Sequence, residues 1–168
     1  MGALRKADFY YGSLLSCFVN RGLAPAIIEP GESRRIYKLA TNDGDFRIYA
    51  KYVSASLPRQ KNDVRLWQFI FSPEEVEYIR EYKEIKTTLY FALICGQERM
   101  QDSEIAILSL DQVKDCLDVH YGRESYRITI KREKGTHGLK VWGTGRADLL
   151  DGKDNTIRIP RDLFSCFK

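Results

Sequence analysis

The chain has 168 residues, of which 43% are apolar and 12% aromatic, and its formal net charge is +4. This composition is typical of a folded globular protein and excludes a disordered one. No apolar run reaches the roughly 18 residues that a membrane helix needs. The charge is uneven, because residues 1–61 carry ten Lys or Arg against five Asp or Glu, residues 62–122 carry six against twelve, and residues 123–168 carry eleven against six. Basic ends around an acidic middle either bind a polyanion or are solvated surface whose opposite charges meet in three dimensions.

The first predicted elements are a helix over residues 3–21 and a β-hairpin. Two strand-like segments, 34–41 and 46–53, flank the sequence Asn-Asp-Gly-Asp, whose central Asp-Gly suits a two-residue hairpin turn. That turn predicts a register in which Leu39 faces Ile48 on an apolar face. The other face would then present basic side chains around an aromatic one, and these are Lys38, Arg47, Tyr49 and Lys51.

The middle of the chain predicts a strand, a helix and the strand around which the fold is organised. Residues 65–71 alternate with period two, which puts Trp67, Phe69 and Phe71 on one side. The Ser-Pro-Glu-Glu sequence from residue 72 combines a serine cap, a proline at the first helical position and a capping-box glutamate, so a helix begins there. Residues 87–95 are apolar or small throughout, which predicts a strand buried on both faces.

The last third predicts further β-structure with a second basic hairpin. A strand over residues 104–109 leads into a helix with another capping box, and residues 125–133 and 138–143 alternate around a turn. A final strand follows at residues 156–160. The basic side chains of the second hairpin are Arg127, Lys131, Arg132, Lys134 and Lys140.

These elements together predict a single α+β domain over residues 1–168. We expect an α/β core over residues 1–122, followed by a C-terminal antiparallel β extension over residues 123–168. The core would hold a mixed β-sheet in which residues 87–95 form the central buried strand. We expect three helices, and about seven or eight strands in this one mixed sheet. The extension is either a continuation of this sheet or a small subdomain of its own.

No nucleophile elbow, phosphate-binding loop or zinc-ligand spacing occurs in the sequence. The two glycines of Gly-Thr-Gly-Arg-Ala-Asp at residues 143–148 predict a turn, because the strand and helix of a dinucleotide site are missing around them. The four cysteines are widely scattered, which favours reduced thiols in a cytoplasmic protein over a zinc site or disulfides. We therefore expect no cofactor, no metal and no membrane association.

One resemblance adds to this interpretation. The third strand carries Tyr49-Ala50-Lys51, and Glu32 follows Pro30-Gly31 upstream. With the order helix, hairpin, strand, helix, buried strand, residues 3–96 resemble the restriction-endonuclease-like core of the PD-(D/E)XK superfamily. In that family an acid two residues before the lysine helps to hold Mg²⁺, and here a tyrosine, a poor magnesium ligand, occupies its place. The resemblance implies a nuclease-like fold without catalysis; in a metal-dependent nuclease, Glu32 and Lys51 would be the catalytic candidates.

The leading hypothesis is a non-catalytic module that binds DNA or RNA, or that assists a nucleic-acid-processing partner, through the two basic hairpins. An alternative from another class is a protein-binding inhibitor or immunity-type factor whose acidic middle or exposed aromatic side chains contact a protein partner. A metal-dependent nuclease is the second alternative. The sequence leaves open whether any enzymatic activity remains, and it leaves the oligomeric state open.

Overall fold

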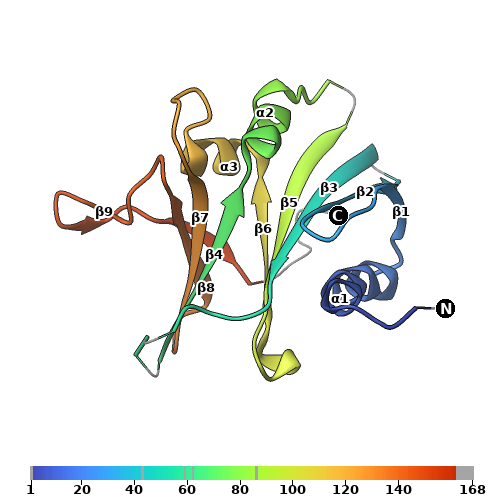
Figure 1. Ribbon diagram of the computed structural model, residues 1–168, viewed down its shortest axis with the longest axis horizontal. Coiled ribbons are helices and arrows are strands. Elements are labelled where there is room, and N and C mark those ends of the chain that lie inside the picture. The colour runs from blue at the N-terminus through green and yellow to red at the C-terminus, as the bar shows by residue number, and fades with distance from the viewer. Residues whose placement is uncertain (1, 43, 59, 62, 86, 162–168) are drawn as a thin grey trace.

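Over residues 2–42, 44–58, 60–61, 63–85 and 87–161, which the computed structural model describes, the fold consists of three α-helices and two main β-sheets (Figure 1). The first is a mixed sheet with the strand order β1-β2-β3-β5-β6, in which β3 and β5 are parallel and the other neighbours antiparallel. Its strands are β1 (Ala24–Glu29), β2 (Arg35–Thr41), β3 (Gly44–Val53), β5 (Thr88–Cys95) and β6 (Glu104–Ser109). The predicted α+β class with a mixed sheet is confirmed.

The second sheet is antiparallel, with the order β11-β8-β7-β4. Its strands are β4 (Val64–Phe71), β7 (Tyr126–Glu133), β8 (Gly138–Gly143) and β11 (Ile157–Pro160); β9 (Leu149–Leu150) pairs separately with β10 (Lys153–Asp154), and a 3-10 turn spans Met100–Asp102. The C-terminal antiparallel extension is therefore a sheet of its own, which takes β4 from the earlier part of the chain. The expectation of one sheet with seven or eight strands is wrong, because the aromatic side of β4 packs face to face on the mixed sheet.

Strand β5 lies between β3 and β6 and is buried on both faces. Leu89, Phe91 and Leu93 are fully buried in the core between the two sheets. Ala92 and Ile94 point the other way, into the core beneath α1. The prediction of an organising strand without a polar face is confirmed.

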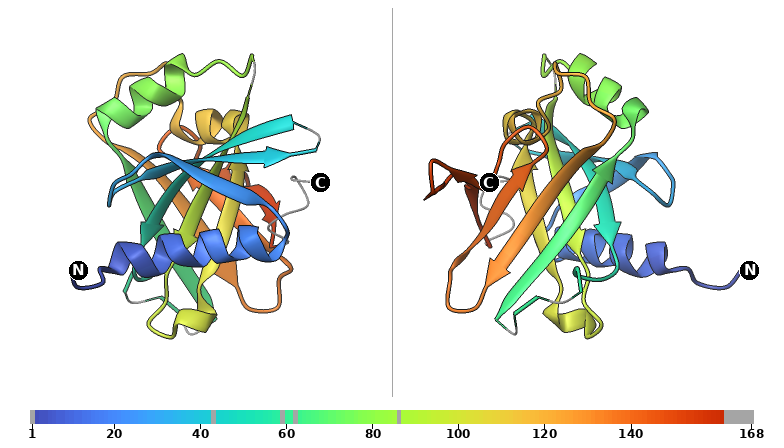
Figure 2. Two further views of the ribbon diagram at one scale, coloured as in Figure 1. Left: turned by 90° about the vertical axis from the view of Figure 1, so that its right-hand side faces the viewer. Right: turned by 60° about the vertical axis from the view of Figure 1, so that its left-hand side comes forward.

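The helices cover the mixed sheet from one side and close one end of the molecule (Figures 1 and 2). Helix α1 (Lys6–Asn20) packs on the face opposite the antiparallel sheet, while α2 (Pro73–Glu81) and α3 (Leu110–Leu117) lie together at one end. Both shorter helices begin with the predicted capping boxes, built on Ser72 and Ser109. None of the helices in the described ranges is long and apolar enough to cross a membrane.

The first hairpin differs from its predicted register by two residues. Leu39 pairs with Phe46 rather than Ile48, and Thr41 pairs with Gly44. The Thr41 hydroxyl donates to the Gly44 carbonyl at 2.6 Å, which fixes the strand ends around Asn42; Asp43 lies outside the described residues. A shift of two residues keeps every side chain on its predicted face. The face that carries Tyr49 and Lys51, however, is covered by α2 and β4.

The segment Gly-Thr-Gly-Arg-Ala-Asp is a turn, as predicted, and it is held tightly against α3. The Gly145 amide donates to the Cys116 carbonyl at 2.8 Å, and the Thr144 amide donates to the Arg127 carbonyl at 3.0 Å. A Cβ atom on Gly143 would lie 2.4 Å from the Cys116 carbonyl oxygen, so only glycine permits this approach. The glycines therefore serve the packing of β8 against α3.

Candidate nucleic-acid interface

The basic face predicted for the first hairpin is not one surface. Lys38 is exposed and forms an ion pair with Asp45 at 3.2 Å. Arg47 points toward α2, where its Nη1 donates to the Tyr78 hydroxyl at 3.3 Å. Tyr49 is fully buried and Lys51 is only 6% exposed. The expectation of a solvated cationic face is wrong here because β3 is an interior strand, covered on both sides.

Lys51 belongs to a buried polar cluster whose centre is Glu75. Its ammonium group donates to both carboxylate oxygens of Glu75, at 2.9 and 2.8 Å, and the Tyr49 hydroxyl donates to Oε2 at 2.5 Å. The Phe71 ring lies 5.0 Å from Lys51 Nζ. Burial lowers the pKa of the Lys51 ammonium group and raises the pKa of the Tyr49 hydroxyl. The positive charge of Lys51 is thus paired with the Glu75 carboxylate inside the protein.

Glu75 also completes the capping box of α2, since its Oε1 accepts from the Ser72 amide at 3.2 Å. One carboxylate therefore fixes the start of α2 and docks that start onto β3. The capping role follows from four adjacent residues and was predicted. The pairing with Lys51, 24 positions away, has no local signature in the sequence.

The two residues proposed for a metal-dependent nuclease have different partners in the structure. The Glu32 side chain is 60% exposed and pairs with Arg5 at 2.5 Å, while Lys51 pairs with Glu75 inside the molecule. Asp45, the other acid near the hairpin turn, is held by Lys38. Within the described ranges, no cluster of three or more His, Cys, Asp or Glu side chains has an arrangement that could hold a metal ion.

The second hairpin divides its basic residues between two places. Lys131 and Lys140 face each other across β7 and β8 on the outer side of the antiparallel sheet, and both contact Glu133, at 3.6 and 2.9 Å. Arg127 is exposed on the same side, opposite Ile70 of β4. Arg132 points the other way, and Lys134 lies in the turn after β7.

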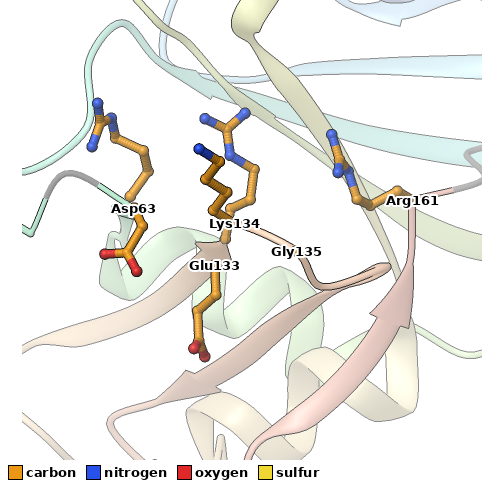
Figure 3. A pocket seen from close by; sticks show the side chains of 7 residues that line it. Asp63, Glu133, Lys134, Gly135 and Arg161 are labelled. Atoms are coloured by element: carbon orange, nitrogen blue, oxygen red, sulfur yellow. The ribbon is translucent and has the colours of Figure 1, made fainter.

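Arg132 and Lys134 take part in a pocket of about 260 Å³ at the end of the antiparallel sheet away from α2 and α3 (Figures 1 and 3). Four cationic and two acidic side chains line it, together with one glycine: Asp63, Arg65, Arg132, Glu133, Lys134, Gly135 and Arg161. In Figure 3 the cationic groups of Lys134 and Arg161 project to one side, while the carboxylates of Asp63 and Glu133 point the opposite way. We call this site the basic pocket.

The arginines of the basic pocket are held by backbone pairing and by one shared carboxylate. Arg65 and Arg132 are directly opposite each other in the β4–β7 register, where like charges repel. Glu104 of β6, only one-tenth exposed at its side chain, accepts from Arg132 Nη1 at 3.2 Å and from Arg161 Nε at 3.3 Å. The Trp67 ring lies 5.7 Å from the Arg132 guanidinium carbon. The pocket is therefore preorganised by contacts behind its cationic groups.

The sequence predicted two of the four cations of this pocket and missed Arg65 and Arg161. Arg65 is the second residue of β4, whose partner β7 lies more than 60 residues later, and Arg161 follows the last strand. The alternation of apolar and polar residues along a strand indicates on which side of the sheet a residue lies. It does not indicate which strand lies next to it. Only the pairing of β4 with β7, and of β11 with β8, brings them together.

Comparison of the chain with models of protein families, with curated proteins and with solved structures finds no match.

Proposed function

We propose that the protein is a non-catalytic module that binds DNA or RNA, or that assists a nucleic-acid-processing partner. The observation that carries the proposal is the gathering of four cationic side chains around the basic pocket, continued by Arg127, Lys131 and Lys140 on the outer face of the same sheet. Basic groups at a surface bind phosphates and release condensed counterions, which provides most sequence-independent affinity. A cytoplasmic location is part of the proposal, since Cys17, Cys95 and Cys116 are free thiols; the fourth cysteine, Cys166, lies outside the described residues.

The restriction-endonuclease-like resemblance is a proposal that the order of elements supports. Helix α1 is followed by β1, β2 and β3, then by α2 and β5, and β3 carries Lys51. Strand β4 is inserted between β3 and α2 and joins the second sheet. Since Lys51 is occupied by Glu75 and Glu32 by Arg5, we expect no cleavage of DNA or RNA with Mg²⁺ or Mn²⁺. Cleavage that is lost in both Glu32→Ala and Lys51→Ala would instead support the nuclease alternative.

Fluorescence anisotropy with labelled single-stranded and duplex DNA and RNA tests the binding proposal. We expect binding at about 50 mM salt that weakens steeply toward about 200 mM, because each phosphate contact releases counterions. The variant Arg65→Gln/Lys134→Gln should weaken binding, whereas Lys6→Gln, an exposed lysine of α1 on the opposite side of the mixed sheet, should not. If the protein binds none of these nucleic acids at about 50 mM salt, the proposal is contradicted.

The second candidate function is recognition of a protein partner, as in an inhibitor or immunity-type factor. Helix α2 favours this candidate, because three of its glutamates are exposed while Glu75 is buried. The exposed ones are Glu74, Glu77 and Glu81. Such an acidic edge suits a basic protein surface. A pull-down from the native cell extract, with and without nuclease treatment, separates the two candidates: a partner held through nucleic acid is lost after treatment, and a direct partner is retained.

A further inference from the structure

The basic pocket differs in shape from a surface that follows a nucleic-acid backbone. Its cations come from three separate segments: Arg65 from β4, Arg132 and Lys134 from β7 and the following turn, and Arg161 from the residue after β11. They line a pocket of about 260 Å³ that is partly open to solvent. A compact anion with several acceptor oxygens fits such a cavity, whereas successive phosphates of a strand need a row of cations along a groove.

The donors of the pocket are oriented before any ligand binds. The Arg132 guanidinium uses Nη1 for Glu104 and for the Asp102 carbonyl, and it lies beside the Trp67 ring. Within the described part of the chain no ion pair engages the ammonium group of Lys134, which is exposed at the rim. A guanidinium fixed from behind loses little further freedom on binding an oxyanion, so its contribution to affinity is large.

The carboxylates near the pocket restrict how an anion can enter. Glu133 Oε1 already forms an ion pair with Lys140 Nζ at 2.9 Å, and this contact, together with the charge of Lys131, lowers the pKa of Glu133. Asp63 lines one side, and its carbonyl accepts from the Lys134 amide at 2.8 Å. The negative charge of the Asp63 carboxylate repels a phosphodiester chain that runs across the pocket. A single anionic group that enters from the cationic side avoids this repulsion.

We infer that the basic pocket binds the terminal phosphate of a nucleic-acid strand, so that the module recognises strand ends. The inference rests on the proposed nucleic-acid binding and adds the kind of group that this site takes. A terminal phosphate carries a charge of about −1.5 to −2 and three strong acceptor oxygens, against one charge for an internal phosphodiester. The cations of Arg65, Arg132, Lys134 and Arg161 would share these oxygens.

The test compares three fluorescently labelled oligonucleotides of one sequence that carry a 5′-phosphate, a 3′-phosphate or hydroxyl groups only. Anisotropy at one fixed salt concentration should show roughly tenfold tighter binding to one phosphorylated form, as one to three new charge-assisted hydrogen bonds allow. The Arg65→Gln/Lys134→Gln variant should lose this preference, and Lys6→Gln should keep it. Thermal unfolding of both variants at the wild-type temperature shows that the fold is intact.

The possible outcomes separate the inference from the proposed function. Equal, salt-dependent affinity for all three oligonucleotides would overturn end recognition and leave nucleic-acid binding standing. A preference that survives in Arg65→Gln/Lys134→Gln would overturn the assignment to the basic pocket. Absence of binding to all three would contradict the proposed function and the inference together.

Discussion

The β2–β3 and β7–β8 hairpins carry similar alternating patterns of apolar and basic residues, but their basic side chains meet different surroundings. In the first hairpin Lys51 is buried and bonded to Glu75. In the second, Lys131 and Lys140 lie on the outer face of a sheet and contact Glu133 at the surface. The difference arises because β3 is covered on both faces, whereas β7 is covered only on the side toward the mixed sheet.

This comparison separates two uses of a positive charge. A buried ammonium group needs a carboxylate partner, because its desolvation is costly, and it is then unavailable to a ligand. A cation at the end or on the outer face of a sheet keeps part of its hydration and can exchange an internal partner for a phosphate. We therefore assign Lys51 a structural role, and we assign the proposed binding to Arg65, Arg132, Lys134 and Arg161.

The largest effect is expected when the buried ion pair between Lys51 of the first hairpin and Glu75 is broken. Lys51→Met leaves the Glu75 carboxylate buried without its cation, and we expect a loss of about 3–5 kcal/mol in the free energy of unfolding. Urea denaturation followed by circular dichroism measures it. Lys38→Met, which removes an exposed ion pair on the same hairpin, should cost about 1 kcal/mol or less.

A double variant distinguishes an unpaired charge from lost packing. Lys51→Met/Glu75→Gln removes both charges and keeps an acceptor oxygen for the capping box at Ser72. It should be more stable than Lys51→Met alone. If the double variant is no more stable than the single one, the cost of Lys51→Met comes from packing and not from the uncompensated carboxylate.

The next effect concerns the third member of the cluster. Tyr49→Phe removes the hydroxyl that donates to Glu75 and leaves the ring in place against Phe91, 5.1 Å away between ring centroids. A hydrogen bond to a charged group contributes about 1.5–3 kcal/mol, so we expect a loss in that range in the same denaturation experiment. An unchanged free energy of unfolding would mean that the Lys51 contacts alone satisfy the carboxylate.

Local features of this fold were predictable because they depend on adjacent residues. The apolar run of β5, the capping boxes of α2 and α3, and the alternation of β7 and β8 each act within about ten positions and lie where the sequence indicates them. Strand β1 was missed, since its six residues include Pro25 and have no clean alternation. In α1 the helix was predicted and its buried face only in part: the apolar residues Leu14 and Phe18 are buried, while Phe9 is exposed.

Features that depend on which strands become neighbours were not predictable. The alternation of the first hairpin gives two faces correctly but does not say that β4 and α2 cover the face with Lys51. The basic pocket needs β4 beside β7, and β11 beside β8, before Arg65 and Arg161 approach Arg132. Long-range pairing is set by the packing of the whole chain, so a candidate site made of distant strands is visible only in the fold.

A smaller effect is expected on nucleic-acid affinity, where a lysine next to the second hairpin's strand β7 is compared with one on the first hairpin. Lys134→Gln should weaken nucleic-acid binding about tenfold or less and should reduce the slope of log affinity against log salt by about 0.7–0.9, the value of one phosphate contact. Lys38→Gln provides the matched control on the first hairpin, and both affinity and slope should stay at their wild-type values. Equal losses in the two variants, measured by anisotropy over a salt series, would contradict the assignment of binding to the second hairpin.

The smallest effect is the pH dependence of stability that comes from Asp154, whose carboxylate contacts cations of the second hairpin and of β11. Asp154 accepts from the Thr156 hydroxyl at 2.6 Å, from the Thr156 amide at 2.9 Å and from Arg158 Nη2 at 3.2 Å, and it forms an ion pair with Lys140 at 3.1 Å. The contacts with Thr156 and Lys140 hold the pKa of its carboxyl group below the usual 3.8. Because the folded pKa is lowered, the stabilisation is complete above the unfolded value and is lost as the pH falls below about 3.8 toward the folded pKa.

Replacement of this titrating group tests that dependence. Asp154→Asn should be less stable than the wild type near neutral pH, and the difference should shrink as the pH falls below about 3.8, since the wild-type carboxylate is then protonated. Thr156→Val removes the strongest donor and should raise the titration midpoint of Asp154, as followed by NMR of its carboxyl carbon, while Lys140 keeps it partly lowered. A midpoint at or above 3.8 in the wild type would show that the surface contacts of the second hairpin are too weakly populated to shift the titration, in contrast to the buried pair of the first.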